Sequence, residues 1–211
     1  LAARPAMGKT SLALNIAQNS ALKAGAKVAI FSLEMSKEEI ANRIWFSEAL
    51  IESGKIRKGD MQAEDWSSLV TAITVLANAK IYIDDTAAIT VMEIRSKCRR
   101  LAAEHGLDLI IIDHIQLMDS AKRVENRQQE ITEISRTLKM LAKDLNTPVL
   151  ALSQLSRASA TRPDKSKRPV LTDLRESGSL EQDADVVLML HRDDYYNENT
   201  EHPGEAELII A

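Results

Sequence analysis

The sequence has one cysteine, few aromatic residues and no long apolar run, and each shortage excludes a class of protein. Cys98 alone cannot form a disulfide framework or a cysteine-rich metal site, and it shares a helical face with Ile94 and Leu101, which predicts packing. No apolar run reaches the length of a membrane span and no signal peptide is recognisable, so we expect a cytoplasmic protein without membrane contact. Aromatic residues make up only 3% of the chain, which argues against a surface that stacks on nucleic-acid bases.

The composition is that of a globular protein with a substantial core. The chain has 211 residues, of which 45% are apolar and 27% are charged. Its formal charge of −4 would by itself argue against nucleic-acid binding. Any such binding must therefore depend on local clusters of basic residues.

Short apolar segments alternate with helical segments along the chain. Ser36 with Glu39, and Thr90 with Glu93, form capping-box patterns that open two of the helices. We predict strands at 27–33, 81–83, 109–112, 148–152 and 185–190, helices at 8–23, 36–50, 63–78, 90–105 and up to about 145, and a polar connection at 54–59. Strands that alternate with helices predict an α/β fold with a mostly parallel, twisted sheet and helices on both faces.

Residues 3–10, Ala-Arg-Pro-Ala-Met-Gly-Lys-Thr, fit the phosphate-loop pattern G-x-x-x-x-G-K-[ST], except that Ala3 stands where the first glycine is expected. In this pattern backbone N–H groups cradle phosphates, Gly8 permits a close approach, Lys9 reaches the outer phosphates, and the Thr10 hydroxyl can ligate Mg²⁺. The helix that follows points its positive dipole end at the same phosphates. The pattern predicts a site for a nucleoside triphosphate, formed by Ala3, Arg4, Pro5, Ala6, Met7, Gly8, Lys9, Thr10 and Ser11.

Polar residues follow three of the predicted strands, at the sheet edge where parallel sheets bind ligands. Asp113 follows the strand 109–112 as a Walker B acid would, holding Mg²⁺ directly or through water. Glu34 could deprotonate the attacking water, and Gln154 could detect a γ-phosphate. Each alone could be a solvated residue at a strand end, and Glu34 could instead favour the N-terminus of the next helix. The three together favour hydrolysis over binding alone.

Both ends of the chain read as cut ends of a longer protein. A phosphate loop should follow a buried strand, yet only Leu1 and Ala2 precede this one. The segment 205–211 alternates and then turns apolar, as an interrupted strand would. We therefore expect residues 1–211 to be a single domain, truncated at both ends.

Six motifs carry a resemblance to a known family. They are Ala3–Thr10, Ser32–Met35, Ile112–Met118, Glu125–Glu130, Ala151–Arg157 and Arg175–Gly178. In this order, and over essentially the whole chain, they resemble the RecA-like P-loop NTPase motor domain of the DnaB family of bacterial replicative DNA helicases. The resemblance implies a homo-hexameric ring that hydrolyses ATP with Mg²⁺ at its subunit interfaces and pulls single-stranded DNA through its pore. It also implies primase and a helicase loader as partners, and an N-terminal domain outside this chain.

The resemblance also implies roles for individual residues. Lys9 would bind phosphate and Thr10 the metal, together with Asp113 as the Walker B acid. Glu34 would be the catalytic base and Gln154 the γ-phosphate sensor. The segment that contacts the DNA backbone in this family would contain Arg175, Glu176 and Gly178.

The sequence departs from the family pattern in two places. Ala3 replaces a glycine at a position where the family tolerates alanine. His114 follows Asp113 where the family often has tyrosine, and we interpret it as packing or edge polarity rather than as a ligand. The family's arginine finger and a nearby lysine would lie beyond Ala211.

Two basic clusters offset the negative net charge. Five basic residues against one acid lie between Leu155 and Pro169, and a second cluster precedes the long helix. Both could be solvated loops, but both follow strands with predicted ATP-site residues, so we expect them to grip the DNA backbone. The basic residues are Arg157, Arg162, Lys165, Lys167 and Arg168 in the first cluster, and Lys122, Arg123 and Arg127 in the second.

Three other classes of protein remain open. A RecA-like recombinase would share the fold, the phosphate loop and the glutamate, but would coat DNA without unwinding it. A small-molecule kinase would need an acceptor pocket and an arginine-bearing lid, whereas a long basic loop follows Gln154 here. A nucleotide-gated loader would tolerate the loss of Glu34. A metal site at His191 and Asp193 is disfavoured because no second histidine lies at ligand spacing.

Overall fold

The computed structural model describes residues 1–119, 126–156, 167–197 and 199–211 of the chain. Its strands are β1 (Ala2–Ala3), β2 (Val28–Ser32), β3 (Ile81–Asp84), β4 (Leu109–Asp113), β5 (Val149–Ala151), β6 (Ser153–Gln154), β7 (Leu188–His191) and β8 (Glu207–Ile210). They form two ladders, β3-β2-β4-β5 and β6-β1-β7-β8, in which every pair is parallel except β7 with β8.

The two ladders are halves of one continuous sheet. β5 and β6 are consecutive parts of a single extended segment. The N–H of Leu152 donates to the carbonyl of Ile112 at 2.9 Å, whereas the N–H of Ser153 donates to the carbonyl of Leu1 at 2.9 Å. The segment therefore pairs with β4 up to Leu152 and with β1 beyond it, which places β1 in the middle of the sheet.

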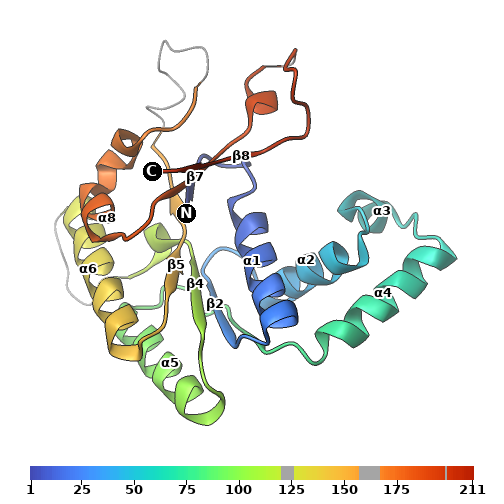
Figure 1. Ribbon diagram of the computed structural model, residues 1–211, viewed down its shortest axis with the longest axis horizontal. Helices are drawn as coiled ribbons and strands as arrows, with labels where there is room; N and C mark the ends of the chain where they lie inside the picture. Colours follow the sequence, from blue (N-terminus) through green and yellow to red (C-terminus); the bar gives the residue numbers. More distant parts are fainter. Residues whose placement is uncertain (120–125, 157–166, 198) are drawn as a thin grey trace.

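Helices cover both faces of this sheet. They are α1 (Lys9–Ala24), α2 (Lys37–Ala49), α3 (Ser53–Lys58), α4 (Ala63–Leu76), α5 (Val91–His105), α6 (Arg127–Leu145) and α8 (Gly178–Asp183), with short 3₁₀ turns η1 (Ile115–Leu117), η2 (Leu171–Ser177) and η3 (Asp193–Tyr195). α5, α6 and α8 lie on one side, and α1, α2 and α4 on the other (Figure 1). The predicted α/β fold, with a mostly parallel sheet and helices on both faces, is confirmed. Among the described residues, no helix has the length and apolarity to cross a membrane.

The capping boxes form as predicted and fix where two helices begin. The hydroxyl of Ser36 accepts from the N–H of Glu39 at 3.2 Å, and the Glu39 carboxylate accepts from the N–H of Ser36 at 3.0 Å. Thr90 and Glu93 make the same reciprocal pair at the start of α5. Both pairs satisfy backbone donors that the first helical turn leaves free.

The core lies on both faces of the sheet, as β4 shows. Ile110 and Ile112 belong to a cluster under α5 and α6, and Ile111 to a cluster under α1 and α2; each is at most 1% exposed. Cys98 is fully buried in the first cluster, which confirms that it is a packing residue. β4 is therefore a central strand buried on both sides.

Some local predictions are wrong. The predicted connection 54–59 is mostly helix α3, which ends at Gly59 with a φ of +70° and is held to α4 by Lys55 Nζ, 3.1 Å from Asp65 Oδ1. The strand predicted from residue 185 begins only at Leu188, because Asp185 turns out of the sheet to bond Lys139 Nζ at 2.5 Å. η2 and α8 were not predicted, since elements of 7 and 6 residues are too short to show a helical period.

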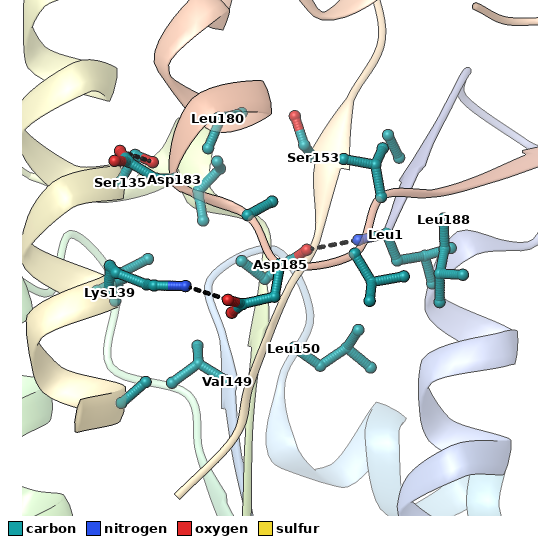
Figure 2. Close-up of a pocket in the computed structure, with 18 of the residues that line it drawn as sticks. Leu1, Ser135, Lys139, Val149, Leu150, Ser153, Leu180, Asp183, Asp185 and Leu188 are labelled. Carbon is teal, nitrogen blue, oxygen red and sulfur yellow. Dashed lines mark hydrogen bonds and ion pairs between the residues drawn. The ribbon is translucent and has the colours of Figure 1, made fainter. Parts of the chain in front are cut away.

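An apolar cavity of about 440 Å³ lies between β5, α6 and the segment that leads into β7 (Figure 2). Leu1, Leu150 and Leu188 are among its lining residues. Beside it, Ser135 Oγ donates to Asp183 Oδ2 at 2.6 Å and ties α6 to α8. Among the described residues, none that is predicted for the nucleotide site lines this cavity, so it is separate from the candidate nucleotide site.

Candidate nucleotide-binding site

The phosphate loop joins β1 to α1, and its backbone explains why one glycine is needed and the other is not. Ala3 ends β1 in register with Gln154 and Leu190 and is 1% exposed. Because strand backbone is open to any residue, alanine fits there. Gly8 has a φ of +91°, in the left-handed region that favours glycine, and its carbonyl accepts the first N–H bond of α1 from Leu12 at 2.9 Å.

The other loop residues divide between support and exposure. Met7 is 2% exposed and packs under the loop, and Arg4 Nη1 donates to the carbonyl of Leu155 at 3.1 Å. Pro5, Ala6 and Ser11 are exposed. The loop is therefore tied to Leu155, the residue after β6, and its tip is open for a ligand.

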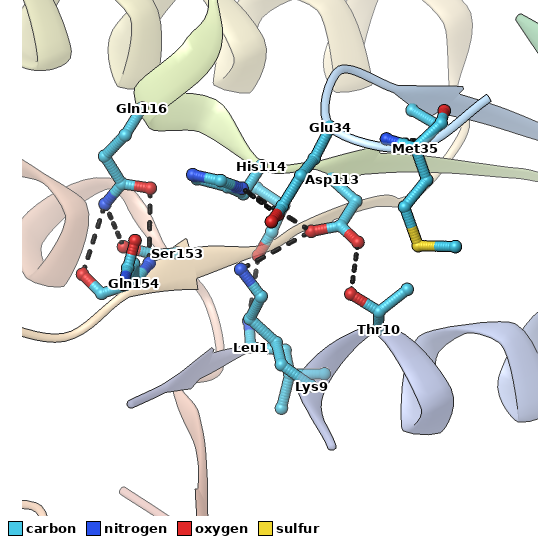
Figure 3. A network of polar contacts seen from close by, with 12 residues as sticks. Leu1, Lys9, Thr10, Glu34, Met35, Asp113, His114, Gln116, Ser153 and Gln154 are labelled. Carbon is cyan, nitrogen blue, oxygen red and sulfur yellow. Dashed lines mark hydrogen bonds and ion pairs between the residues drawn. The ribbon is translucent and has the colours of Figure 1, made fainter. Parts of the chain in front are cut away.

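Lys9, Thr10 and Asp113 meet where α1 begins, as the sequence predicts (Figure 3). Thr10 Oγ1 donates to Asp113 Oδ2 at 2.5 Å, and Lys9 Nζ lies 3.4 Å from Asp113 Oδ1. Burial lowers the pKa of Lys9 from its ordinary 10.5, and the negative charge of Asp113 opposes this shift. The Asp113 side chain is only 6% exposed, so the carboxylate depends on these two partners.

Glu34 lies at the end of β2, on the other side of Asp113 (Figure 3). Its side chain is 62% exposed, and Oε2 lies 3.3 Å from Nδ1 of His114, which is buried. Burial lowers the pKa of His114 below its ordinary 6.5 and the charge of Lys9 adds to this, outweighing Asp113 and Glu34. The imidazole is therefore neutral at pH 7, and its contact with Glu34 is a polar contact between a neutral ring and a carboxylate.

The structure agrees with the expectation for His114, which allowed packing or polarity at the strand edge. It is buried and packs at the strand end, as predicted, but it also touches the candidate base, a contact that the sequence pattern did not predict. A cis peptide bond joins it to Asp113. Its position directly after the acid in the motif 112–118 places it near the candidate site but does not indicate which residue it contacts.

The oxygens at this edge fit a magnesium ion. Mg²⁺ prefers hard oxygen ligands, keeps several waters, and in nucleotide sites takes few protein ligands beside substrate phosphates. Asp113 Oδ1 is buried and has no hydrogen-bond partner among the described residues, and the Thr10 hydroxyl lies beside the other oxygen of the same carboxylate. No cluster of three or more metal-ligating His, Cys, Asp or Glu side chains occurs among those residues.

Gln154 ends β6 and points its exposed side chain away from the core. Its backbone is held by Gln116, a residue that belongs to one of the sequence motifs but had no predicted role. Gln116 also bonds Ser153 and accepts on its carbonyl a bond from Arg127, the first residue of α6. The predicted sensor therefore lies on the same edge as the predicted phosphate and metal residues.

The predicted DNA-contacting residues are described only in part. Arg127 lies at the start of α6, exposed, and pairs with Glu130. Arg175 and Glu176 fall on η2, and Gly178 is the first residue of α8. The side chains of Arg175 and Glu176 lie outside the described part, as do Arg157 and most of both basic clusters. A cavity of about 390 Å³ lies between Arg4, Arg127, Gln154 and Asp173. Ser156, the last described residue before 157–166, also lines it.

A phosphate loop between a central strand and a helix, with an acid at the end of a neighbouring strand, defines this protein as a P-loop NTPase of the RecA-like fold. Within that class, the chain belongs to the DnaB-like helicase C-terminal domain family, whose model matches residues 1–211. The resemblance given by the six sequence motifs is confirmed.

Relatives and solved structures agree with this assignment. The replicative DNA helicase DnaB of Geobacillus stearothermophilus is 54% identical over 212 residues, and the replicative DNA helicase DnaC of Bacillus subtilis (strain 168) is 53% identical over 212. Each alignment covers 100% of this chain and 46% of the relative, so the chain spans about half the length of these relatives. A solved structure titled as a DnaB-like replicative helicase and its interactions with primase matches with a TM-score of 0.94 at 43% identity, over 100% of this chain and 50% of that chain. A second solved structure, titled as an ATPase domain, matches with the same TM-score and identity, over 100% of this chain and 74% of that chain.

Proposed function

We propose that this chain is the ATP-hydrolysing motor of a replicative DNA helicase, which moves along single-stranded DNA and unwinds duplex at the replication fork. The observation that carries the proposal is the meeting of Lys9, Thr10 and Asp113 at the start of α1, with Glu34 and Gln154 on the same sheet edge. Relatives with the same domain are named replicative DNA helicases, which supports DNA as the track and the cytoplasm as the place of action.

The geometry supports a division of labour in ATP hydrolysis. Backbone N–H groups of the loop and the Lys9 ammonium would bind the β- and γ-phosphates and offset the charge that develops on the transferred group. Glu34 would accept a proton from the attacking water, and its exposed carboxylate is free to turn toward that water.

Thr10 and Asp113 would hold the magnesium ion, which supplies Lewis-acid stabilisation of the phosphate oxygens. The Gln154 amide would contact the γ-phosphate and so distinguish ATP from ADP. Among the described residues this side chain makes no hydrogen bond, so it is free to do so.

The proposed partners follow from the family and the relatives. We propose that six copies form a ring with single-stranded DNA in its pore, contacted by Arg127, Arg157, Arg175, Glu176 and Gly178. One matching structure is titled for a helicase and its interactions with primase, which supports primase as a partner of this protein too. A helicase loader completes the set proposed from the family resemblance.

The proposal predicts that the full-length protein separates a forked DNA duplex with ATP and Mg²⁺. Lys9→Ala should lower the unwinding and ATPase rates by about 100-fold or more, because it removes the main charge at the transferred phosphate. Lys23→Ala is the matched control, since Lys23 is exposed in the last turn of α1 and away from the loop.

Substrates with only a 5′ or only a 3′ tail would show which strand the protein follows. ATP hydrolysis stimulated by DNA but without strand separation would contradict the helicase proposal and favour a recombinase-like ATPase. Unchanged biological activity in a Glu34→Gln variant that no longer hydrolyses ATP would instead favour a nucleotide-gated loader.

A further inference from the structure

The side chain of Gln116 makes three hydrogen bonds with the end of β6. Its Nε2 donates to Ser153 Oγ at 2.8 Å and to the Gln154 carbonyl at 3.3 Å, and its Oε1 accepts from the Gln154 N–H at 3.2 Å (Figure 3). The side-chain amide thus bonds both the N–H and the C=O of one backbone residue, as a neighbouring strand would. It fixes the backbone from which the Gln154 side chain projects.

The register of the sheet shows why the backbone of Gln154 needs the hydrogen bonds from Gln116. Along the extended segment, the N–H groups of Ser153 and Leu155 point to β1, where they donate to Leu1 and Ala3 at 2.9 Å. The N–H groups of Leu152 and Gln154 point the other way. The N–H of Leu152 donates to the carbonyl of Ile112 on β4.

At Gln154 the neighbouring strand is gone, because β4 ends at Asp113 and the chain turns into η1. The amide of Gln116, in the middle of η1, takes the place of the missing strand. Without it, this exposed N–H and C=O would bond only to water, and the end of β6 would no longer be tied to η1.

The backbone of Gln116 is also held in place, by a hydrogen bond from Arg127. Arg127 Nη2 donates to its backbone carbonyl at 2.5 Å, and Arg127 is the first residue of α6. Gln116, Arg127 and Gln154 line the same cavity of about 390 Å³. The backbone of Gln116 therefore contacts a residue of the proposed DNA-facing cluster, and its side chain contacts the backbone of the proposed sensor.

We propose that Gln116 is a positioning residue, which holds the end of β6 so that the Gln154 side chain meets the γ-phosphate. This inference rests on the proposed function, because it assigns Gln116 a part in the same ATP site. Gln116 acts through Gln154 and does not itself touch the nucleotide. Its loss should therefore affect the response to the γ-phosphate more than the binding of the nucleotide as a whole.

The test uses two substitutions in the full-length protein. Gln116→Met keeps the length of the side chain but removes all its hydrogen bonds, and Gln116→Glu keeps an acceptor for the Gln154 N–H but loses the donors. Gln182→Ala, at an exposed position on α8, is the matched control. The readouts are kcat for ATP hydrolysis with single-stranded DNA, and the affinities for fluorescent ADP and ATPγS.

Gln116→Met should lower kcat by about tenfold, and the kcat of Gln116→Glu should lie between that of Gln116→Met and that of the wild type. The affinity of both variants for ADP should change by less than about twofold. The preference for ATPγS over ADP should fall, because it reports contact with the third phosphate. In a Gln154→Ala background, Gln116→Met should lower kcat no further, since two residues that act through one contact are not additive.

Equal fold losses from Gln116→Met in the wild-type and Gln154→Ala backgrounds would overturn the inference. So would a parallel loss of ADP affinity, which would show that Gln116 merely supports the fold of the site. If the unsubstituted protein binds ADP and ATPγS but shows no DNA-stimulated hydrolysis, the proposed function fails, and the ATPγS preference then decides whether Gln116 positions Gln154. An unchanged preference in Gln116→Met would overturn the inference in that case too.

Discussion

The hydroxyl of Thr10 is the smallest group on which the proposed chemistry depends. It lies 2.5 Å from a carboxylate oxygen of Asp113, whose other oxygen is buried without a hydrogen bond among the described residues. A hydroxyl and a carboxylate so placed suit a metal that also binds phosphate oxygens. The hydroxyl should therefore matter for nucleotide binding only when Mg²⁺ is present.

Thr10→Ala is expected to remove most of the gain in nucleotide affinity that Mg²⁺ provides, at least about tenfold, while affinity in EDTA changes little. The reason is that the substitution deletes a metal ligand but leaves Lys9 and the loop N–H groups. Titration of a fluorescent ATP analogue in Mg²⁺ and in EDTA measures both quantities. Thr10→Ser keeps the hydroxyl and should behave as wild type, and an equal loss of affinity in EDTA would show that Thr10 binds phosphate instead.

At the residue scale, motif spacing predicted which side chains meet at the candidate site wherever a proposed ligand requires a particular residue type. Lys9, Thr10 and Asp113 could be placed because a phosphate and a metal demand an ammonium, a hydroxyl and a carboxylate at fixed positions. The contacts of His114 and Gln116 could not be predicted, because their partners depend on where neighbouring strands end in three dimensions. That Gln116 bonds the backbone of Gln154 depends on β4 ending before β6 does, which no local pattern encodes.

At the element scale, β3 is the outer strand of its half of the sheet and is tied to α5 by charge. Lys97 Nζ lies 2.5 Å from Asp84 Oδ2, with both side chains about one-third exposed. Burial raises the pKa of Asp84, but hydrogen bonds from Lys97 and Thr86 outweigh it, so the folded pKa lies below the ordinary 3.8. Because the folded state binds the proton less readily, this pair stabilises the fold above about pH 4 and loses its effect as pH falls through the folded pKa.

Lys97→Met is therefore expected to lower the free energy of unfolding by about 0.5 kcal/mol at pH 7, a value typical of a partly exposed ion pair. The difference from wild type should stay constant down to about pH 5 and shrink below pH 4, where Asp84 becomes protonated in both states. Urea denaturation across this pH range measures it. Arg99→Met, at an exposed position on the same helix, should show no such pH dependence, and a Lys97→Met effect that persists at pH 3 would mean that the lysine acts through packing alone.

Element prediction succeeded where a segment's own pattern decides its structure. The capping boxes at Ser36 and Thr90 placed the starts of α2 and α5 because both partners of each box are local. It failed at 185–187, where an apolar run reads as strand but Asp185 bonds Lys139 on α6. A contact between residues 46 positions apart overrides a local preference, and no window of sequence contains it.

At the scale of the whole molecule, the two larger buried clusters lie on opposite faces of the sheet. Ile110 is 0% exposed in the cluster under α5 and α6, and Ile111 is 1% exposed in the cluster under α1 and α2. In a sheet with one solvated face, only one of two successive residues would be buried. Covering both faces makes neighbouring positions of a central strand equally important for stability.

Ile110→Val and Ile111→Val are each expected to lower the free energy of unfolding of the 211-residue chain by about 1 kcal/mol, the usual cost of one buried methylene. Ile210→Val, at a position that is 74% exposed, should have almost no effect. The double variant Ile110→Val with Ile111→Val should show the sum within about 0.5 kcal/mol, because the two side chains lie in different clusters. Urea denaturation with a constant slope measures the wild type and all four variants under the same conditions. A substantial loss at only one of the two positions would mean that one helical layer packs weakly on the sheet, and the two-sided core would then be wrong.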